Sequence, residues 1–446
     1  MQIEYIVRED NTRLLLIFAG WSTDASAFGG LVCPGYDVAV LSGYTDLSVP
    51  DDFAGYSEIV VMAWSLGVWA ASNVLARYRK LPVTLTVAVN GTETPVSDTE
   101  GIPERIYRST LDGLTAQSLL KFRRRMGGGD LPLPSRSVDE LGDELAVVLA
   151  AGAAAGIRWD RAVISDNDMI FPPDNQRRAW QGRADILEMT GAHVPDWQRI
   201  VDALVINKPL VGRRFARGLQ TYMSEADVQI RIAEHLWSMC RKHCGSLNKT
   251  PLSVLEIGYG NGAMTRLYAP ELRPKRLVLW DILDIPSPFG ETAICDGETA
   301  IMELAPDSVD MIISASTVQW FNSLPGFLER CAGVLAPGGL VVISSFGPQT
   351  FHELTEAGVT PLPYMSLESI RRIVPAGMEL LELHEGIITK VFSSPIDVIR
   401  HLRSTGVNGR KSSVPLTKIL TSYPLRSDGR AALTYNPVYF ILRKSQ

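Results

Sequence analysis

The stretch 58–78, EIVVMAWSLGVWAASNVLARY, decides the fold of the first half of the chain, because it places Ser65 between an apolar run and a helical run. A serine at such a strand-to-helix turn is exposed for nucleophilic attack, and small flanking residues permit the sharp backbone turn. Gly67 is one such residue, while Ala63 stands where a glycine is more usual. The stretch therefore predicts a nucleophilic serine in an α/β fold.

Further apolar runs on both sides of this stretch predict more strands of a parallel sheet. Such strands are covered on both faces and lose the alternation of apolar and polar residues. From about residue 102 to 156 the pattern changes to helical spacing, and we expect an inserted helical lid there. The runs are LLLIFAG (14–20), YDVAVLSGY (36–44), VTLTVAVNGT (83–92), RAVISDND (161–168) and ILEMTGAH (186–193).

A single histidine, His193, occurs before residue 230. It follows the last predicted strand. In α/β-hydrolases the catalytic residues follow the order serine, acid, histidine along the chain, and this order places the general base after the last strand. The acid should lie on the loop after the preceding strand, so that it holds the imidazole tautomer. Asp168, 25 residues before His193, is the preferred candidate, and Asp166 and Asp98 remain alternatives.

Stabilisation of a developing oxyanion needs two backbone N–H groups. Leu66, directly after Ser65, supplies the first. The second is expected from the loop after the run 14–20, where Gly20 and Trp21 turn the backbone toward Ser65. Trp21 is equally compatible with plain packing.

The phrases FAGW, AWSLGVW, VAVNGT, GIPERIY, STLDGLT and LKFRRRM resemble the BioG family of pimeloyl-acyl carrier protein methyl ester esterases over residues 10–205. The resemblance implies an α/β-hydrolase fold with a helical lid and a triad of Ser65, Asp168 and His193. It also implies that basic lid residues dock an acidic carrier protein, in line with charge steering. The alternative is a solvated helix face without a partner. The candidate docking residues are Lys121, Arg123, Arg124 and Arg125.

The alternation of strands and helices restarts near residue 205, which predicts two domains, 1–207 and 208–446. In the second, the strand VLEI leads into a turn with Gly258, Gly260 and Gly262, and glycines let the backbone approach a ligand closely. Glu256 precedes this turn, and Asp281 ends the next strand 23 residues after Gly258. Such an acid accepts hydrogen bonds from both ribose hydroxyls.

This loop also fits a dinucleotide site, because Ala263 satisfies the G/A variant of the glycine pattern. The later sequence favours S-adenosylmethionine instead. Asp296 follows the third predicted strand and suits the adenine amino group, and the run VLAPGGLVVISSF is typical of class I (Rossmann-like) methyltransferases. We therefore predict an S-adenosylmethionine-dependent methyltransferase in the second domain.

More narrowly, residues 210–446 resemble the BioC family of malonyl-acyl carrier protein O-methyltransferases. The resemblance implies that Tyr222 closes over S-adenosylmethionine and that Gln319 and Trp320 lie near the transferred methyl group. A basic residue would help to hold a carboxylate substrate, and Arg403 is a candidate. The phrases that carry the resemblance are Phe215 to Tyr222, Val318-Gln319-Trp320, His401 to Asn408, and LTYNPVYFILRK.

Together the two resemblances imply a bifunctional enzyme of biotin synthesis, a serine carboxylesterase joined to an O-methyltransferase. One half would methylate malonyl-acyl carrier protein, and the other would hydrolyse the pimeloyl-acyl carrier protein methyl ester. Two alternatives stay open: the pair acts on another acyl or secondary-metabolite substrate, or one half is a non-catalytic module that docks the carrier protein.

Composition limits the location and the partners of the chain. The net charge of −6 gives no reason to expect a nucleic-acid partner. The five cysteines are scattered and odd in number, which favours a reducing cytoplasm. The spacing of Cys240, His243 and Cys244 lacks a second ligand pair for a metal site. Neither a signal peptide nor a membrane span is expected.

Overall fold

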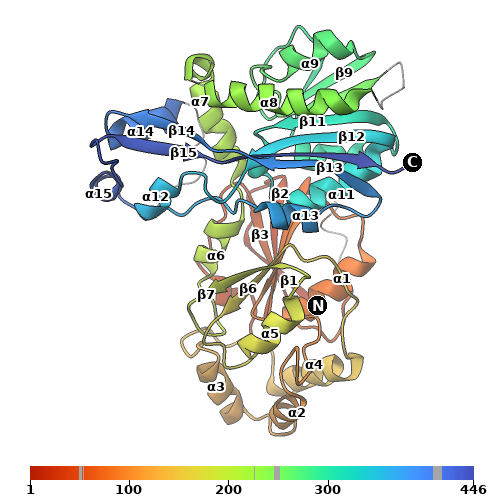
Figure 1. The fold of residues 1–446 in the computed structure, drawn as a ribbon. Helices are drawn as coiled ribbons and strands as arrows, with labels where there is room; N and C mark the ends of the chain where they lie inside the picture. Colours follow the sequence, from red (N-terminus) through yellow and green to blue (C-terminus); the bar gives the residue numbers. More distant parts are fainter. Residues whose placement is uncertain (50–52, 54, 226, 246–251, 405–413) are drawn as a thin grey trace. The chain divides into compact units, whose positions relative to one another are not determined.

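The computed structural model describes residues 1–49, 53, 55–225, 227–245, 252–404 and 414–446 (Figure 1). The chain divides into two compact units, unit 1 (Met1–Val205) and unit 2 (Ile206–Gln446). This division lies two residues before the domain limit predicted from the sequence. Each unit is built around a seven-stranded sheet with helices. Among the described residues, no helix is long and apolar enough to cross a membrane.

The sheet of unit 1 has the order β1-β3-β2-β4-β5-β6-β7, with β1 antiparallel to β3 and the other neighbours parallel. The sequence predicted all of these strands except β1, an edge strand that is largely half-exposed and has no continuous apolar run. The strands are β1 (Gln2–Val7), β2 (Arg13–Phe18), β3 (Asp37–Ser42), β4 (Glu58–Trp64), β5 (Val83–Val89), β6 (Arg161–Ser165) and β7 (Asp185–Met189).

Helices of unit 1 fall into two groups. The first consists of α1 (Leu66–Arg77), α5 (Pro173–Trp180) and α6 (Trp197–Leu204), which alternate with the strands and help to bury them. The second, which we call the lid, consists of α2 (Glu104–Asp112), α3 (Ala116–Arg125) and α4 (Val138–Ala151), inserted between β5 and β6. Capping boxes begin α3 and α4, and Figure 1 shows the three lid helices gathered beyond one end of the sheet.

The sheet of unit 2 has the order β10-β9-β8-β11-β12-β16-β13, and only β16 runs antiparallel to its neighbours. The chain order reverses between β8 and β11, and ligands of such Rossmann-like sheets bind at the carboxyl ends of the strands at this point. The strands are β8 (Ser253–Ile257), β9 (Arg276–Asp281), β10 (Glu291–Ile294), β11 (Val309–Ala315), β12 (Leu335–Phe346), β13 (Met378–Glu385) and β16 (Pro437–Lys444).

The remaining elements of unit 2 cover this sheet or extend from it. A two-stranded sheet pairs β14 (Ile388–Phe392) with β15 (Ala431–Tyr435). In Figure 1 it lies beside α14 and α15. The helices are α7 (Lys208–Glu225), α8 (Asp227–Cys244), α9 (Thr265–Leu272), α10 (Gly297–Ala300), α11 (Leu324–Val334), α12 (His352–Glu356), α13 (Leu367–Arg372), α14 (Pro395–Ser404) and α15 (Leu416–Ser422).

Candidate active sites

Ser65 lies at a strained turn between β4 and α1, with a φ of 59°. Two glycines allow the surrounding backbone to pack against this turn. A Cβ on Gly67 would approach Phe18 O to 2.3 Å, and a Cβ on Gly91 would approach Ser65 O to 2.3 Å. Positive φ at a non-glycine residue persists only where the surrounding structure enforces it. The fold therefore holds Ser65 at the end of the central strand.

The structure brings Ser65, His193 and Asp168 into one hydrogen-bonded row. His193 Nε2 lies 3.0 Å from Ser65 Oγ, and His193 Nδ1 lies 2.8 Å from Asp168 Oδ2. All three residues are buried. The alternatives lie elsewhere, because exposed Asp166 accepts the N–H of Gly191, and exposed Asp98 accepts the N–H of Glu104, the first residue of α2.

Asp168 and His193 are held by contacts that the sequence did not predict. Asp168 Oδ1 accepts two backbone N–H groups, from Ile170 and Phe171, and its Oδ2 also accepts the side-chain N–H of Gln176. The carbonyl of His193 accepts hydrogen bonds from Trp64 Nε1 and Asn90 Nδ2. Asn90, the polar residue directly after β5, was visible in the sequence as the end of VAVN, but only the fold shows what it holds.

A pocket of about 380 Å³ opens beside Ser65. Trp21 and Leu66 line it, as does Arg125, whereas most of the other lining residues are apolar. Leu66 begins α1, where backbone N–H groups have no intrahelical partner. Trp21 Nε1 donates to Leu141 O of the lid at 2.9 Å. Both predicted oxyanion residues therefore line the same pocket as the serine.

The predicted basic cluster of α3 is divided by the structure. Lys121, Arg124 and Arg125 are exposed, but Arg123 is only 2% exposed. Its guanidinium donates to the carbonyls of Ser22, Leu131 and Pro132. The expectation that Arg123 contacts a docking partner is therefore wrong: consecutive helical positions face different directions, and this one faces the interior.

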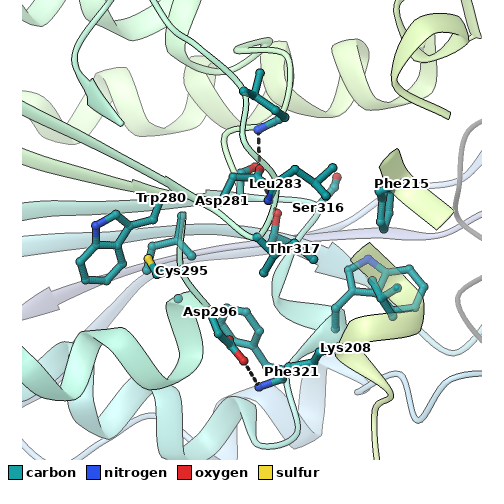
Figure 2. Close-up of a pocket in the computed structure, with 18 of the residues that line it drawn as sticks. Lys208, Phe215, Trp280, Asp281, Leu283, Cys295, Asp296, Ser316, Thr317 and Phe321 are labelled. Atoms are coloured by element: carbon teal, nitrogen blue, oxygen red, sulfur yellow. Dashed lines mark hydrogen bonds and ion pairs between the residues drawn. The ribbon is translucent and has the colours of Figure 1, made fainter. Parts of the chain in front are cut away.

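A pocket of about 900 Å³ lies in unit 2, at the point where the strand order reverses (Figure 2). Its walls come from the ends of β8, β9, β10 and β11, together with the first turns of α7. Figure 2 shows Asp281 and Asp296 along the pocket wall. Predicted residues that line the pocket are Gly258, Gly260, Asp281, Asp296 and Trp320.

Asp281 is fixed by the glycine loop it faces. Its Oδ2 accepts the N–H of Gly260 at 2.9 Å, and its Oδ1 accepts the N–H of Leu283 at 3.0 Å. Gly258 and Gly260 adopt φ of 71° and 51°, a region that favours glycine. Burial raises the pKa of Asp281 above its usual value. Hydroxyl donors from a ligand would compensate for this burial.

Lys208, at the start of α7, is a pocket residue that the sequence did not reveal. Its Nζ lies 2.7 Å from Asp296 Oδ2 and 2.6 Å from Glu298 Oε2, and the Asp296 contact is drawn in Figure 2. Lys208 is 5% exposed and Glu298 is fully buried. A lone lysine next to a predicted boundary carries no motif, and only the fold shows its two acidic partners.

Several predicted cofactor residues do not line this pocket. Glu256 instead accepts the hydroxyls of Thr265 and Tyr268 in the core, where burial raises its pKa to about 7. Gly262 lies in the turn, where its N–H donates to Tyr259 O. Gln319 Nε2 donates to Ser316 O, and Arg403, the candidate for holding a carboxylate substrate, is exposed. The expectation that Tyr222 closes over S-adenosylmethionine concerns a side chain outside the described part of the chain.

Two family models match the chain. The model described as "Pimeloyl-ACP methyl esterase BioG" matches residues 1–199, and a model described as "Methyltransferase domain" matches residues 255–343. A solved structure of BioG from Haemophilus influenzae is 33% identical, with a TM-score of 0.40, and the match covers 43% of this chain and 94% of that one.

Relatives match either nearly the whole chain or about half of it. A "Malonyl-[acyl-carrier protein] O-methyltransferase" from Bacteroides fragilis is 31% identical over 461 residues, 96% of this chain and 92% of that protein. A protein of the same name from Chlorobium luteolum is 34% identical over 258 residues, 54% of this chain and 97% of that protein. The first relative therefore spans both units, whereas the match to the second covers about half of this chain.

Proposed function

This chain belongs to the family of malonyl-[acyl-carrier protein] O-methyltransferases, and we propose that it carries out two reactions of biotin synthesis at two separate sites. Unit 2 would methylate the free carboxyl group of malonyl-acyl carrier protein. Unit 1 would hydrolyse the methyl ester of pimeloyl-acyl carrier protein to the acid and methanol. A methyl ester hides the charge during chain elongation, so both reactions belong to one sequence of steps.

S-adenosylmethionine is the methyl donor, and the pocket of unit 2 has the groups to hold it. The glycine loop leaves room for a close approach of the ligand, and Asp281 and Asp296 suit the ribose hydroxyls and the adenine amino group. Two buried polar atoms in this pocket, Ser316 Oγ and Trp320 Nε1, have no hydrogen-bond partner among the described residues. Bound S-adenosylmethionine supplies an activated methyl group on a positively charged sulfur.

The protein has little acid–base work to do at this site. The carboxylate of malonate is already ionised near neutral pH, so alignment of the carboxylate with the methyl group limits the rate. The side chains of Phe215 and Trp320, whose rings meet edge to face at 5.8 Å, form an apolar wall that excludes water. We assign these two residues to positioning rather than to proton transfer.

For unit 1 we propose an α/β-hydrolase fold with the lid over its active site and a catalytic triad of Ser65, His193 and Asp168. The 3.0 Å approach of His193 Nε2 to Ser65 Oγ is the observation that carries this proposal. His193 would remove the hydroxyl proton as Ser65 attacks the ester carbonyl, while Asp168 accepts the N–H at Nδ1. The N–H groups of Leu66 and Trp21 would stabilise the oxyanion.

The triad would then complete hydrolysis in two further steps. His193 would return the proton to the departing methoxide, which leaves as methanol, while the acyl group stays on Ser65 Oγ. Water, deprotonated by His193, would then attack the acyl carbonyl, and His193 would give this proton to Ser65 Oγ as the acyl–oxygen bond breaks and the acid leaves. The exposed cations Lys121, Arg124 and Arg125 would dock the acidic carrier protein next to the pocket mouth.

The test separates the two reactions in the full-length protein. Malonyl-acyl carrier protein is incubated with methyl-labelled S-adenosylmethionine, and pimeloyl-acyl carrier protein methyl ester is assayed for release of methanol. We expect Ser65→Ala to abolish only the hydrolysis and Asp281→Asn to weaken only the methyl transfer. Hydrolysis that survives Ser65→Ala would refute the triad, and failure of the unsubstituted protein in both assays would refute the assignment to biotin synthesis.

A further inference from the structure

The loop that follows β2 in unit 1 is tied to the lid at four consecutive residues, 21 to 24. This loop carries the proposed second oxyanion donor, the N–H of Trp21. A side chain or backbone group of the lid segment 123–141 meets each residue in turn. The bonds are Trp21 Nε1 to Leu141 O (2.9 Å), Arg123 Nη1 to Ser22 O (2.6 Å), Arg136 Nη2 to Thr23 O (3.2 Å) and Ser135 N to Asp24 Oδ2 (2.9 Å).

Two of these bonds come from charged side chains of the lid segment, those of Arg123 and Arg136. Arg123 is the more buried of the two, with 2% of its surface exposed. Its guanidinium makes three hydrogen bonds, all to carbonyl oxygens, at 2.6 Å to Ser22, 2.8 Å to Leu131 and 2.6 Å to Pro132. Among the described residues it forms no ion pair with a carboxylate within 4.0 Å. Burial of this cation is costly, and the three carbonyl acceptors, together with the nearby negative charge of Asp24, offset that cost and fix the guanidinium in place.

The residue that Arg123 holds is itself strained. Ser22 has a φ of 63°, a conformation that a serine keeps only when its surroundings impose it. The carbonyl of Ser22 is bonded to Arg123, and the next carbonyl, of Thr23, is bonded to Arg136. Without these bonds the loop would relax, and the proposed oxyanion donor, the N–H of Trp21, would be displaced.

We propose that Arg123 is a positioning residue of the esterase, which holds the oxyanion loop through the carbonyl of Ser22. This inference rests on the proposed hydrolysis in unit 1. Helix α3 would thereby have two roles: Lys121 and Arg124 face the solvent, where we propose that a carrier protein docks, while Arg123 faces inward and holds the oxyanion loop. The lid is then part of the catalytic machinery rather than only a cover.

The experiment measures hydrolysis of a small water-soluble methyl ester without carrier protein, so that docking plays no part. In Arg123→Met, we expect kcat to fall about 10- to 100-fold with KM changed less than about twofold, because a displaced oxyanion donor costs less than the 100- to 1000-fold of a deleted one. Affinity for a trifluoromethyl ketone, which forms an oxyanion on the serine, should fall by a similar factor. Arg123→Lys keeps the charge and should recover part of kcat.

Controls distinguish this role from others. Arg199→Met, an exposed change on α6 outside the lid, should leave both constants unchanged. Arg124→Met should raise KM for the carrier-bound ester. If Arg123→Met fails to fold, Arg123→Lys carries the test through its kcat and ketone affinity. A change in KM alone, or an unchanged ketone affinity in folded variants, would overturn the proposal, whereas hydrolysis that survives Ser65→Ala would instead overturn the triad.

Discussion

The two pockets of this chain differ in how much of their chemistry the protein supplies. In unit 1 the polar groups around Ser65 bond to one another, and Asp168 alone accepts four hydrogen bonds from the protein. In unit 2 the pocket is larger, about 900 Å³ against about 380 Å³, and polar atoms such as Ser316 Oγ lack partners among the described residues.

This difference follows from the two reactions proposed. Ester hydrolysis needs a nucleophile that the protein must activate, so base and acid must be preorganised before the substrate arrives. Methyl transfer to a carboxylate uses a nucleophile that is already charged and a donor that is already activated, so the protein mainly provides shape and alignment. Substitutions should therefore act on rate in unit 1 and on binding or stability in unit 2.

The largest effect is expected at the triad acid. Asp168→Asn should lower kcat for ester hydrolysis about 10,000-fold, because the amide favours the wrong tautomer of His193. Asp166→Asn, at the exposed carboxylate bonded to Gly191, should change kcat less than about twofold. Steady-state hydrolysis by the two variants decides between the two acids, and the reverse result would assign the role to Asp166.

The next largest effect concerns the stability of unit 2. Lys208→Met leaves the carboxylates of Asp296 and Glu298 without their shared cation, and breaking a buried ion pair costs about 3–5 kcal/mol. Urea denaturation of the full chain measures the free energy of unfolding. The transition of unit 2 is identified as the one that S-adenosylhomocysteine shifts, and we expect its free energy of unfolding to fall. Lys275→Met, at an exposed position, is the matched control. Equal losses in both variants would show that the Lys208 pair contributes little.

The pH dependence of unit 2 gives a somewhat smaller effect. Burial raises the pKa of Glu256 to about 7, above the roughly 4.3 of an unfolded glutamate, so the folded chain retains this proton at intermediate pH. Raising the pH from about 4.5 to 7 therefore destabilises the protein relative to Glu256→Gln by on the order of 3 kcal/mol. Parallel stability curves for the two proteins would contradict this expectation. Glu303→Gln, an exposed change, should follow the unsubstituted protein.

Asp281 should produce the smallest of these effects, in cofactor binding. Asp281→Asn removes a charged acceptor of hydroxyl groups and should weaken S-adenosylhomocysteine binding about 10- to 50-fold, a loss of about 1.5–2.5 kcal/mol. Isothermal titration calorimetry measures it directly. Asp284→Asn, at the exposed residue three positions on, should bind within about twofold of the unsubstituted protein. Similar losses in both variants would point to general electrostatics rather than to a hydrogen bond.

Candidate site residues could be selected from the sequence where a residue type was rare or a motif was local. His193 could be selected because no other histidine precedes residue 230, and Gly258 with Asp281 could be selected by their spacing along one strand-turn-helix-strand path. The resemblance to two families was confirmed by the full-length relative and by the two family models. Sequence reasoning failed for Arg123, because the three consecutive arginines 123–125 look alike in the sequence, and only the folded helix shows which of them faces the interior.

The sequence by itself determined two α/β units, the strand-to-helix turn at Ser65 and the glycine loop at Gly258, because each depends on neighbours along the chain. Only the tertiary structure decided which residues distant in the sequence are brought into contact. These pairs are Asn90 with His193, Lys208 with Asp296, and Arg123 with Ser22. Their partners are about 90 to 100 residues away. No local pattern encodes such pairs, since their energies come from burial and hydrogen bonds that exist only after folding.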